Sequence, residues 1–250
     1  MILEVRNLKK YFAVERGFFK SSRGIVKALD DVSFDIEQFK TLGVVGESGS
    51  GKSTLAKLIL DLIPCTAGTI EFNRELISNF RKDVQIIFQN PYNSLNPKMR
   101  IIDIISEPLL IHNIVPRAQT RARAMELIEM VGLDKTTLQR LPIEFSGGQR
   151  QRICIARALA SEPKFLVLDE PISSLDLTIQ AQMLDLFLQL KDKFKLTYIF
   201  ISHNLAVIKH IADNVAVMQQ GKVVELNSAK AIFNNPINPY TQILLEAAKR

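Results

Sequence analysis

This 250-residue sequence has no long apolar run, no cysteine cluster and no secretion-type N-terminus. No apolar stretch reaches the roughly 20 residues that a membrane-spanning helix needs, and residues 1–6 lack the basic-then-apolar order of a signal peptide. The only two cysteines, Cys65 and Cys154, form no CxxC pair, so neither a disulfide framework nor a zinc site is indicated. These absences predict a cytoplasmic globular protein whose cysteines are plain core or surface thiols.

The sequence also lacks a segment in which basic or acidic residues are concentrated. The formal net charge of +6 is compatible with nucleic acid, an anionic membrane surface or bound triphosphates, so it does not choose among them. The densest basic group, around Arg117, Arg121 and Arg123, falls in an expected exposed helix and is interpreted as a solvated face. No nucleic-acid partner is expected.

A glycine-rich turn is present between an apolar strand at residues 41–45 and a helical pattern at residues 55–62. It matches GxxxxGK[ST], in which glycines let backbone N–H groups converge where the helix dipole favours anions. Lys52 is placed to contact the β- and γ-phosphates, and the Ser53 hydroxyl to bind Mg²⁺. The predicted nucleotide-binding residues of this P-loop are Gly46, Glu47, Ser48, Gly49, Ser50, Gly51, Lys52, Ser53 and Thr54.

Three later strand patterns each lead into a polar side chain. The patterns span residues 84–88, 164–168 and 197–202. Ligands of open α/β sheets bind beyond the carboxyl ends of the strands, so Gln89 is placed to reach a metal or its water. Asp169 is expected to orient Mg²⁺ through water, and Glu170 to act as the general base. His203 is expected to bond the γ-phosphate or the attacking water, although a lone histidine is more often structural.

A second anion site is indicated at Ser146, Gly147, Gly148 and Gln149, which open a helix that continues to about residue 160. Ser146 is a suitable N-cap, and the two glycines leave backbone N–H groups at the positive end of the helix dipole. Since the chain has only one P-loop, this site is interpreted as completing the pocket of another copy or a close relative in a head-to-tail pair. The alternative is an ordinary capped helix.

The remaining patterns predict the fold class. Residues 2–6 and 32–36 alternate like an antiparallel edge sheet, and residues 14–27, which include Phe18 and Phe19, are expected to form an exposed loop. Prolines and helical spacing over residues 90–142 indicate an inserted lobe. The prediction is a single α/β domain of residues 1–250. A P-loop NTPase core with a mainly parallel sheet and a β subdomain spans residues 1–89 and 143–250, and an α-helical subdomain is inserted at residues 90–142.

Taken in this order, the motifs resemble an ATP-binding-cassette (ABC) ATPase over nearly the whole chain. The resemblance implies two such subunits with two ATP molecules between them, each held by the P-loop of one subunit and the signature Ser146–Gln149 segment of the other. It also implies that Ser173 and Asp176 belong to a loop crossing the dimer interface. Phe12 would stack on adenine, with Tyr11 as a close rival.

Within that family the chain looks like the peptide-importer group, on the segments 88–97, 144–149 and 235–242. The resemblance implies a peripheral subunit at the cytoplasmic face of the cell membrane. It would pair with itself or a sister ATPase, dock on integral permease subunits, and serve an extracytoplasmic receptor indirectly. The chain departs from the group in ending at Arg250, where many members continue into a cysteine-bearing tail, and in carrying Ile172 where threonine is usual. The substrate subgroup therefore stays open.

Alternative functions are an importer ATPase for nickel or another small solute, and a soluble ABC ATPase of DNA repair or translation. Proteins of the second kind usually carry two cassettes, a coiled-coil insertion or zinc-binding cysteines, and none of these is visible in this sequence. Tyr92 and Leu95, just after Gln89, are expected to contact a permease helix. The alternative for these two residues is that they only cover the core of their own lobe.

Overall fold

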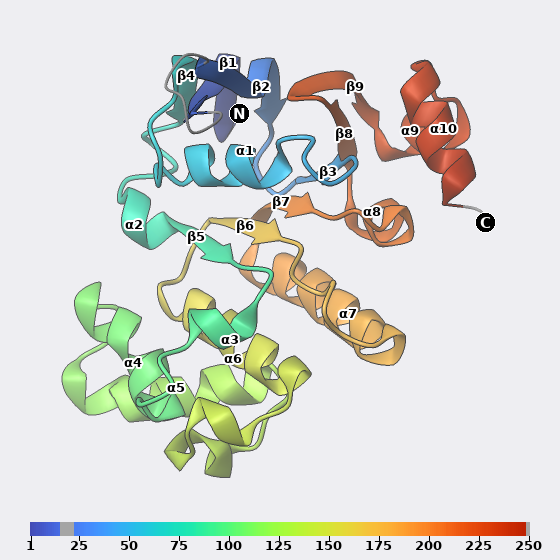
Figure 1. Ribbon diagram of the computed structural model, residues 1–250. Coiled ribbons are helices and arrows are strands. Elements are labelled where there is room, and N and C mark those ends of the chain that lie inside the picture. Colours follow the sequence, from blue (N-terminus) through green and yellow to red (C-terminus); the bar gives the residue numbers. More distant parts are fainter. Residues whose placement is uncertain (16–22, 249–250) are drawn as a thin grey trace. The chain divides into compact units, whose positions relative to one another are not determined.

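The computed structural model describes residues 1–15 and 23–248, so Phe18 and Phe19 lie outside the described residues. The chain divides into two compact units, one formed by Met1–Ile77 with Thr197–Arg250 and the other by Ser78–Leu196. Within the described ranges, each helix is too short or too polar to span a bilayer. The protein is α/β, with mostly parallel strands, a separate antiparallel sheet and a helical segment (Figure 1).

The first unit carries a three-stranded antiparallel sheet in the order β2-β1-β4 (Figure 1). Its strands are β1 (Leu3–Glu15), β2 (Arg23–Ile36) and β4 (Ala67–Phe72). The expectation of a loop throughout residues 14–27 was wrong, because β1 and β2 pair as far as Glu15 and Arg23. This distal part of the hairpin is held by backbone pairing, which a stretch of glycine, serine and basic residues without clear periodicity did not signal.

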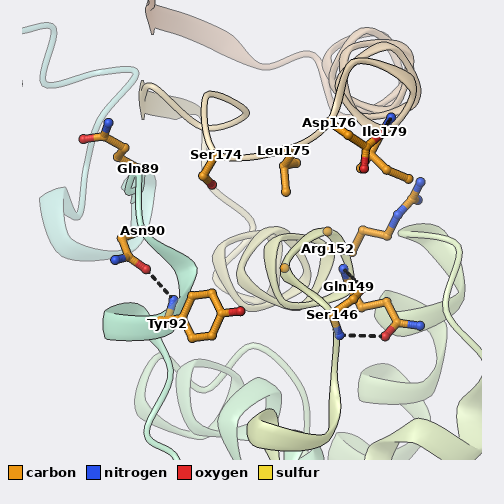
Figure 2. A pocket seen from close by; sticks show the side chains of 12 residues that line it. Gln89, Asn90, Tyr92, Ser146, Gln149, Arg152, Ser174, Leu175, Asp176 and Ile179 are labelled. Carbon is orange, nitrogen blue, oxygen red and sulfur yellow. Dashed lines mark hydrogen bonds between the residues drawn. The ribbon is translucent and has the colours of Figure 1, made fainter.

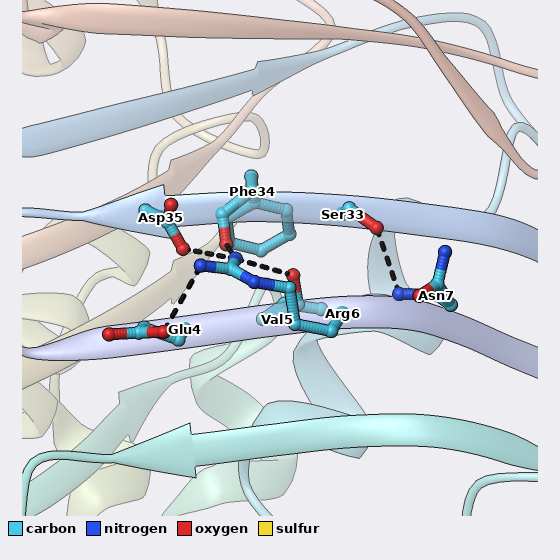
Figure 3. A network of polar contacts seen from close by, with 7 residues as sticks. All are labelled: Glu4, Val5, Arg6, Asn7, Ser33, Phe34 and Asp35. Carbon is cyan, nitrogen blue, oxygen red and sulfur yellow. Dashed lines mark hydrogen bonds and ion pairs between the residues drawn. The ribbon is translucent and has the colours of Figure 1, made fainter.

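A polar network lies where β1 is irregular, between Val5 and Leu8 (Figure 3). Asn7 adopts a left-handed conformation with φ 46°, and its backbone N–H donates to Ser33 Oγ at 2.8 Å. Arg6 bonds Glu4 Oε2 at 3.1 Å from one guanidinium nitrogen and pairs with Asp35 through another. These half-exposed ion pairs contribute little stability by themselves, but they satisfy the side chains beside the bulge.

The remaining strands of the first unit include β3, which leads into the P-loop. They are β3 (Thr41–Val45), β7 (Thr197–Ile201), β8 (Asn214–Gln219) and β9 (Lys222–Ser228). β3 lies between β7 and β8, parallel to both, and every residue of β3 and β7 is buried. β8 and β9 form an antiparallel hairpin. The helices of this unit are α1 (Lys52–Ile59), α8 (Leu205–Ile211), α9 (Ala229–Asn234) and α10 (Pro239–Ala247).

The second unit contains the parallel strands β5 (Val84–Ile87) and β6 (Phe165–Asp169). Its helices are α2 (Phe80–Asp83), α3 (Pro91–Ser94), α4 (Ile101–Ile111), α5 (Thr120–Met130), α6 (Gly147–Ala160) and α7 (Leu177–Phe194). Short 3₁₀ turns lie at Arg117–Gln119, Lys135–Gln139 and Pro142–Glu144. Helices α3, α4 and α5 each pack against α6, so the signature helix contacts the helices of the expected inserted lobe.

Both cysteines behave as plain thiols. Cys65 is exposed, whereas Cys154 is buried in α6, where desolvation raises the pKa of its thiol to about 11. The basic group on α5 is partly neutralised, since Arg123 pairs with Glu126 at 2.8 Å and Glu162 at 3.2 Å. This agrees with the interpretation of that helix as a solvated face.

Candidate nucleotide-binding and catalytic site

The P-loop between β3 and α1 has a backbone that demands glycine at two points. Gly46 has φ 149°, and a Cβ there would lie 2.2 Å from the carbonyl oxygen of Met218 on β8. Gly51 has φ 107°, and a Cβ there would lie 2.4 Å from the carbonyl oxygen of Ala28 on β2. Neighbouring strands therefore press directly on the loop, and any side chain at these positions would displace it.

Lys52 is buried at 6% exposure and folds back over the loop. Its Nζ donates to the carbonyl oxygens of Gly46 at 2.7 Å and Glu47 at 2.9 Å. No described side chain caps the start of α1, and the buried Oγ of Ser50 has no hydrogen-bond partner among the described residues. A buried cation, an uncapped helix start and an unsatisfied hydroxyl in one loop fit an anion such as a phosphate.

Tyr11 and Phe12, the two rings considered for adenine, differ in their surroundings. The Tyr11 hydroxyl donates to Asp30 Oδ1 at 2.5 Å, and this bond raises the pKa of Tyr11. Phe12 is 39% exposed, with Lys10 Nζ 4.9 Å from its ring centroid. The Phe12 ring is therefore the more accessible of the two for stacking.

His203 lies exposed in the turn between β7 and α8. The next residue, Asn204, caps α8 by accepting a hydrogen bond from Ala206 N at 3.0 Å. His203 therefore follows the carboxyl end of β7, where the sequence placed it, and its contact with the γ-phosphate or the water stays a prediction.

In the second unit, Gln89 and Glu170 meet. β5 and β6 are in parallel register, with Ile87 opposite Leu168, so the segments that follow them begin side by side. Gln89 Nε2 donates to Glu170 Oε2 at 2.9 Å. Glu170 has φ 47°, a left-handed conformation, and so turns away from the line of β6, whose last residue is Asp169. Non-glycine residues in that conformation are uncommon and are often found at functional sites.

The signature segment begins α6 with a complete capping box. Ser146 Oγ accepts from the backbone N–H of Gln149 at 3.4 Å, and Gln149 Oε1 accepts from the backbone N–H of Ser146 at 3.1 Å. The predicted N-cap role of Ser146 is confirmed. A Cβ at Gly148 would lie 2.9 Å from Ile179 Cγ2 on α7, so glycine is needed there for close approach.

A pocket of about 840 Å³ opens at the start of this helix (Figure 2). It brings the signature together with the loop that leads into α7, where Asp176 caps the helix by accepting from Ile179 N at 3.0 Å. Ser173 adjoins the pocket-lining residues and donates from Oγ to the Glu170 carbonyl at 3.1 Å. The lining residues are Gln89, Asn90, Tyr92, Ser146, Gly147, Gly148, Gln149, Arg152, Ser174, Leu175, Asp176 and Ile179.

Sequence reasoning missed Arg150, which is only 8% exposed. Its guanidinium donates to the carbonyl oxygens of Pro142 at 2.7 Å and Ile143 at 3.1 Å, and lies 3.9 Å from the ring centroid of Tyr92. It therefore joins the start of α6, the preceding 3₁₀ turn and α3. Nothing in the sequence around Arg150, a basic residue in the first turns of a helix, indicates these partners.

The predicted residues thus form two groups. The P-loop, His203 and Phe12 belong to the first unit, whereas Gln89, Asp169, Glu170, the signature, Ser173 and Asp176 belong to the second. Within the second unit, Gln89 contacts Glu170 directly and shares a pocket with the signature and Asp176. The catalytic, metal-binding and interface roles of these residues stay predictions, as do the domain boundaries.

Comparison with known families agrees with these motifs. The sequence model of the ABC transporter family matches residues 29–173, more than half of the chain. The chain belongs to this family. It is an ABC ATPase, and the resemblance drawn from its motifs is confirmed.

Characterised relatives match almost the full chain. The oligopeptide transport ATP-binding protein OppF of Bacillus subtilis is 48% identical over 98% of this chain and 82% of its own length. The dipeptide transport ATP-binding protein DppF of Escherichia coli is 46% identical over 100% of this chain and 77% of its own. The dimeric ABC transporter cassette MJ0796 covers 91% of this chain and 99% of its own, at 25% identity and a TM-score of 0.76. That cassette has also been solved in a post-hydrolysis state bound to ADP and Pi.

Proposed function

We propose that this ABC ATPase is the nucleotide-binding subunit of a membrane importer for peptides, either oligopeptides or dipeptides. The proposal is carried by the likeness to oligopeptide and dipeptide transport ATP-binding proteins, which extends over 98% or more of the chain at 46–48% identity. An importer of nickel or another small solute is the alternative. A role in DNA repair or translation is not supported by any of these relatives.

The P-loop is proposed to bind the phosphates of ATP, with Lys52 leaving the two carbonyl oxygens that it contacts here to reach the β- and γ-phosphates. Ser53, Gln89 and Asp169 would hold Mg²⁺, which would neutralise phosphate charge when bound. Glu170 would take a proton from the attacking water, with its carboxylate oriented by the Gln89 amide. His203 would bond the γ-phosphate or the water, and Phe12 would stack on adenine.

Two ABC ATPase subunits, identical or related, would form a head-to-tail dimer in which the signature of each completes the pocket of the other. The pocket in front of Ser146 and Asp176 supports this, because it exposes an anion-binding helix start within the second unit. ATP binding would close the dimer and hydrolysis would reopen it. The subunit would act at the cytoplasmic face of the cell membrane through permease subunits, which in turn receive substrate from an extracytoplasmic receptor.

Uptake into membrane vesicles tests the proposal. The chain is co-expressed with the permease and receptor subunits that co-purify with it, and vesicles are loaded with ATP. Labelled di- and oligopeptides should accumulate, and Lys52→Ala should abolish accumulation at normal expression. Uptake of nickel without peptide uptake would support the alternative, and ATP-independent peptide uptake would contradict an ATPase role in the process.

A further inference from the structure

The hydroxyl of Tyr240, in the first turn of α10, lies against the first peptide of the P-loop. The backbone N–H of Glu47 donates to this hydroxyl at 3.3 Å. The same peptide unit presents its carbonyl, that of Gly46, to Lys52 Nζ at 2.7 Å. Because a peptide unit is planar, its N–H and C=O point in opposite directions, so the two bonds together fix one orientation of the plane.

The position of Tyr240 is set by contacts between β9 and the start of α10. Glu225 on β9 accepts hydrogen bonds from the backbone N–H groups of Ile237 at 2.9 Å and Asn238 at 3.0 Å. Asn238 donates from Nδ2 to the Val224 carbonyl at 3.2 Å and caps α10 by accepting from Tyr240 N at 2.9 Å. Three hydrogen bonds therefore hold the start of α10 on β9, and the cap orders the first turn that carries Tyr240.

The β9 strand that anchors α10 is connected to the P-loop through β8. β9 pairs with β8, and the carbonyl of Met218 on β8 lies within 2.2 Å of where a Cβ of Gly46 would stand. Gly46 thus presses on β8 from one side, while Tyr240 holds the adjoining N–H. Tyr240, which makes this contact, belongs to the 235–242 segment that in the sequence marked only a likeness to a subgroup.

We infer that Tyr240 is a positioning residue for the P-loop, acting on Lys52 through the Gly46–Glu47 peptide unit, so that α10 sets the affinity of this subunit for ATP. The inference rests on the proposed role of the P-loop in binding nucleotide. Without the hydroxyl, the peptide plane is free to rotate, and both the N–H array and the carbonyl that holds Lys52 lose their fixed directions. Nucleotide binding must then restore that order, which weakens affinity.

The test compares Tyr240→Phe, which removes only the hydroxyl, with the wild-type chain. ATP affinity is measured by calorimetry in EDTA, and KM and kcat by steady-state hydrolysis with Mg²⁺. Loss of one hydrogen bond that orders the loop should raise the dissociation constant and KM for ATP roughly two- to tenfold. The kcat at saturating ATP should change less than twofold, because the proposed catalytic groups Glu170 and His203 are not touched. Ile243→Ala, at a 64% exposed position of the same helix, is the matched control and should match wild type.

Two results would overturn the inference. One is an unchanged ATP affinity in Tyr240→Phe, and the other is an equal loss in Ile243→Ala, which would indicate general loosening of α10. Glu225→Gln gives an independent reading, since it weakens the anchor of α10; combined with Tyr240→Phe it should add little further loss of affinity. Lys52→Ala separates this inference from the proposed function: if Lys52→Ala binds ATP normally, the P-loop assignment itself is wrong.

Discussion

Gln89 and Glu170 are joined by a 2.9 Å hydrogen bond between Nε2 and Oε2, although 81 residues separate them in the chain. Each follows a strand of the parallel β5 and β6 pair, and Glu170 adopts a left-handed backbone conformation. Such a conformation costs about 1–3 kcal/mol for a residue other than glycine. The fold therefore holds an acid in a fixed place, with an amide that determines the direction of its carboxylate.

Replacing Glu170 with glutamine should leave ATP binding intact and slow hydrolysis by about two to four orders of magnitude, the usual contribution of a general base. The glutamine retains an oxygen that can accept the hydrogen bond from Gln89, so the local geometry is preserved. ATP binding by calorimetry and phosphate release at saturating ATP measure the two effects. The variant should also accumulate as an ATP-bound dimer.

Near-normal turnover of Glu170→Gln would contradict the assignment of the general base. Loss of nucleotide binding would instead indicate a structural role for the carboxylate. Gln89→Ala serves as the companion variant, because it frees the carboxylate without removing it, and it should reduce turnover less than Glu170→Gln does.

Shared pockets predict that two inactive variants restore activity when mixed. Lys52→Ala damages the P-loop, and Ser146→Asp places a negative charge where phosphate would meet the neighbouring subunit's signature. Aspartate still caps a helix, so α6 should remain folded. Each mixed dimer would then hold one intact composite pocket, and ATP hydrolysis should return in part when the two proteins are combined.

Ser146→Asn is the control for this experiment, since it also keeps the cap but adds no charge, and it should retain more activity than Ser146→Asp. The shared-pocket hypothesis fails if either inactivating variant alone hydrolyses ATP at the wild-type rate, with a specific activity independent of protein concentration. If the natural partner is a sister ATPase, the same mixing is done with the matching variant of that subunit.

Leu95 and Tyr92 should respond differently to substitution. Leu95 is 4% exposed and so belongs to the core of its own unit, which contradicts the expectation that it contacts a permease helix. Tyr92 is 60% exposed and lies under the guanidinium of Arg150. Leu95→Asp should destabilise the protein by about 3 kcal/mol or more, because it buries an unpaired charge.

Tyr92→Ala should lower stability by no more than about 1 kcal/mol, the usual value of a partly exposed cation–π contact. Denaturant unfolding of the isolated protein compares the two variants, with Leu95→Ala separating loss of packing from burial of charge. Equal stability of Leu95→Asp and wild type would show that Leu95 is accessible to solvent after all.

The elements that the sequence predicted are those set by local patterns. The P-loop, the strand before Gln89, the strand that ends in Asp169 and the capping role of Ser146 follow from periodicity and cap chemistry within short windows. The likeness to ABC ATPases added the order of these motifs along the chain. Both kinds of signal can be recognised in the sequence because they do not depend on contacts between distant residues.

Contacts between distant segments could not be predicted in the same way. The partners of Arg150 on α3 and the bond from Glu47 to Tyr240 join residues 58 and 193 positions apart, and no periodicity encodes them. Leu95 shows the same limit for burial, since a leucine beside prolines fits both an exposed docking loop and a core. The far part of the β1–β2 hairpin was missed because backbone pairing holds it while its apolar side chains stay exposed, Ile25 at 67% and Val26 at 48%, so no burial pattern marks it.

The Glu225 carboxylate makes the anchoring of α10 dependent on pH. Burial alone would raise the pKa of Glu225, but hydrogen bonds, which include those from the backbone N–H groups of Ile237 and Asn238, together outweigh it, and the pKa lies below its usual 4.5. A lowered folded-state pKa means that the ionised carboxylate stabilises the fold fully above about pH 4.5. That contribution is lost as the pH falls through the lower, folded-state value.

Glu225→Gln should therefore be less stable than wild type at pH 7, and the difference in unfolding free energy between the two should shrink as the pH is lowered below about 4.5. Urea unfolding of both proteins at a series of pH values measures this difference, in which the titration of all other acids cancels. Glu246→Gln, at an exposed position of α10, shows what the loss of one negative charge does by itself. A constant difference across the whole pH range would mean that the charge of Glu225 contributes nothing to stability. Glutamine would then be less stable only because it has one acceptor oxygen for the Ile237 and Asn238 hydrogen bonds, where glutamate has two.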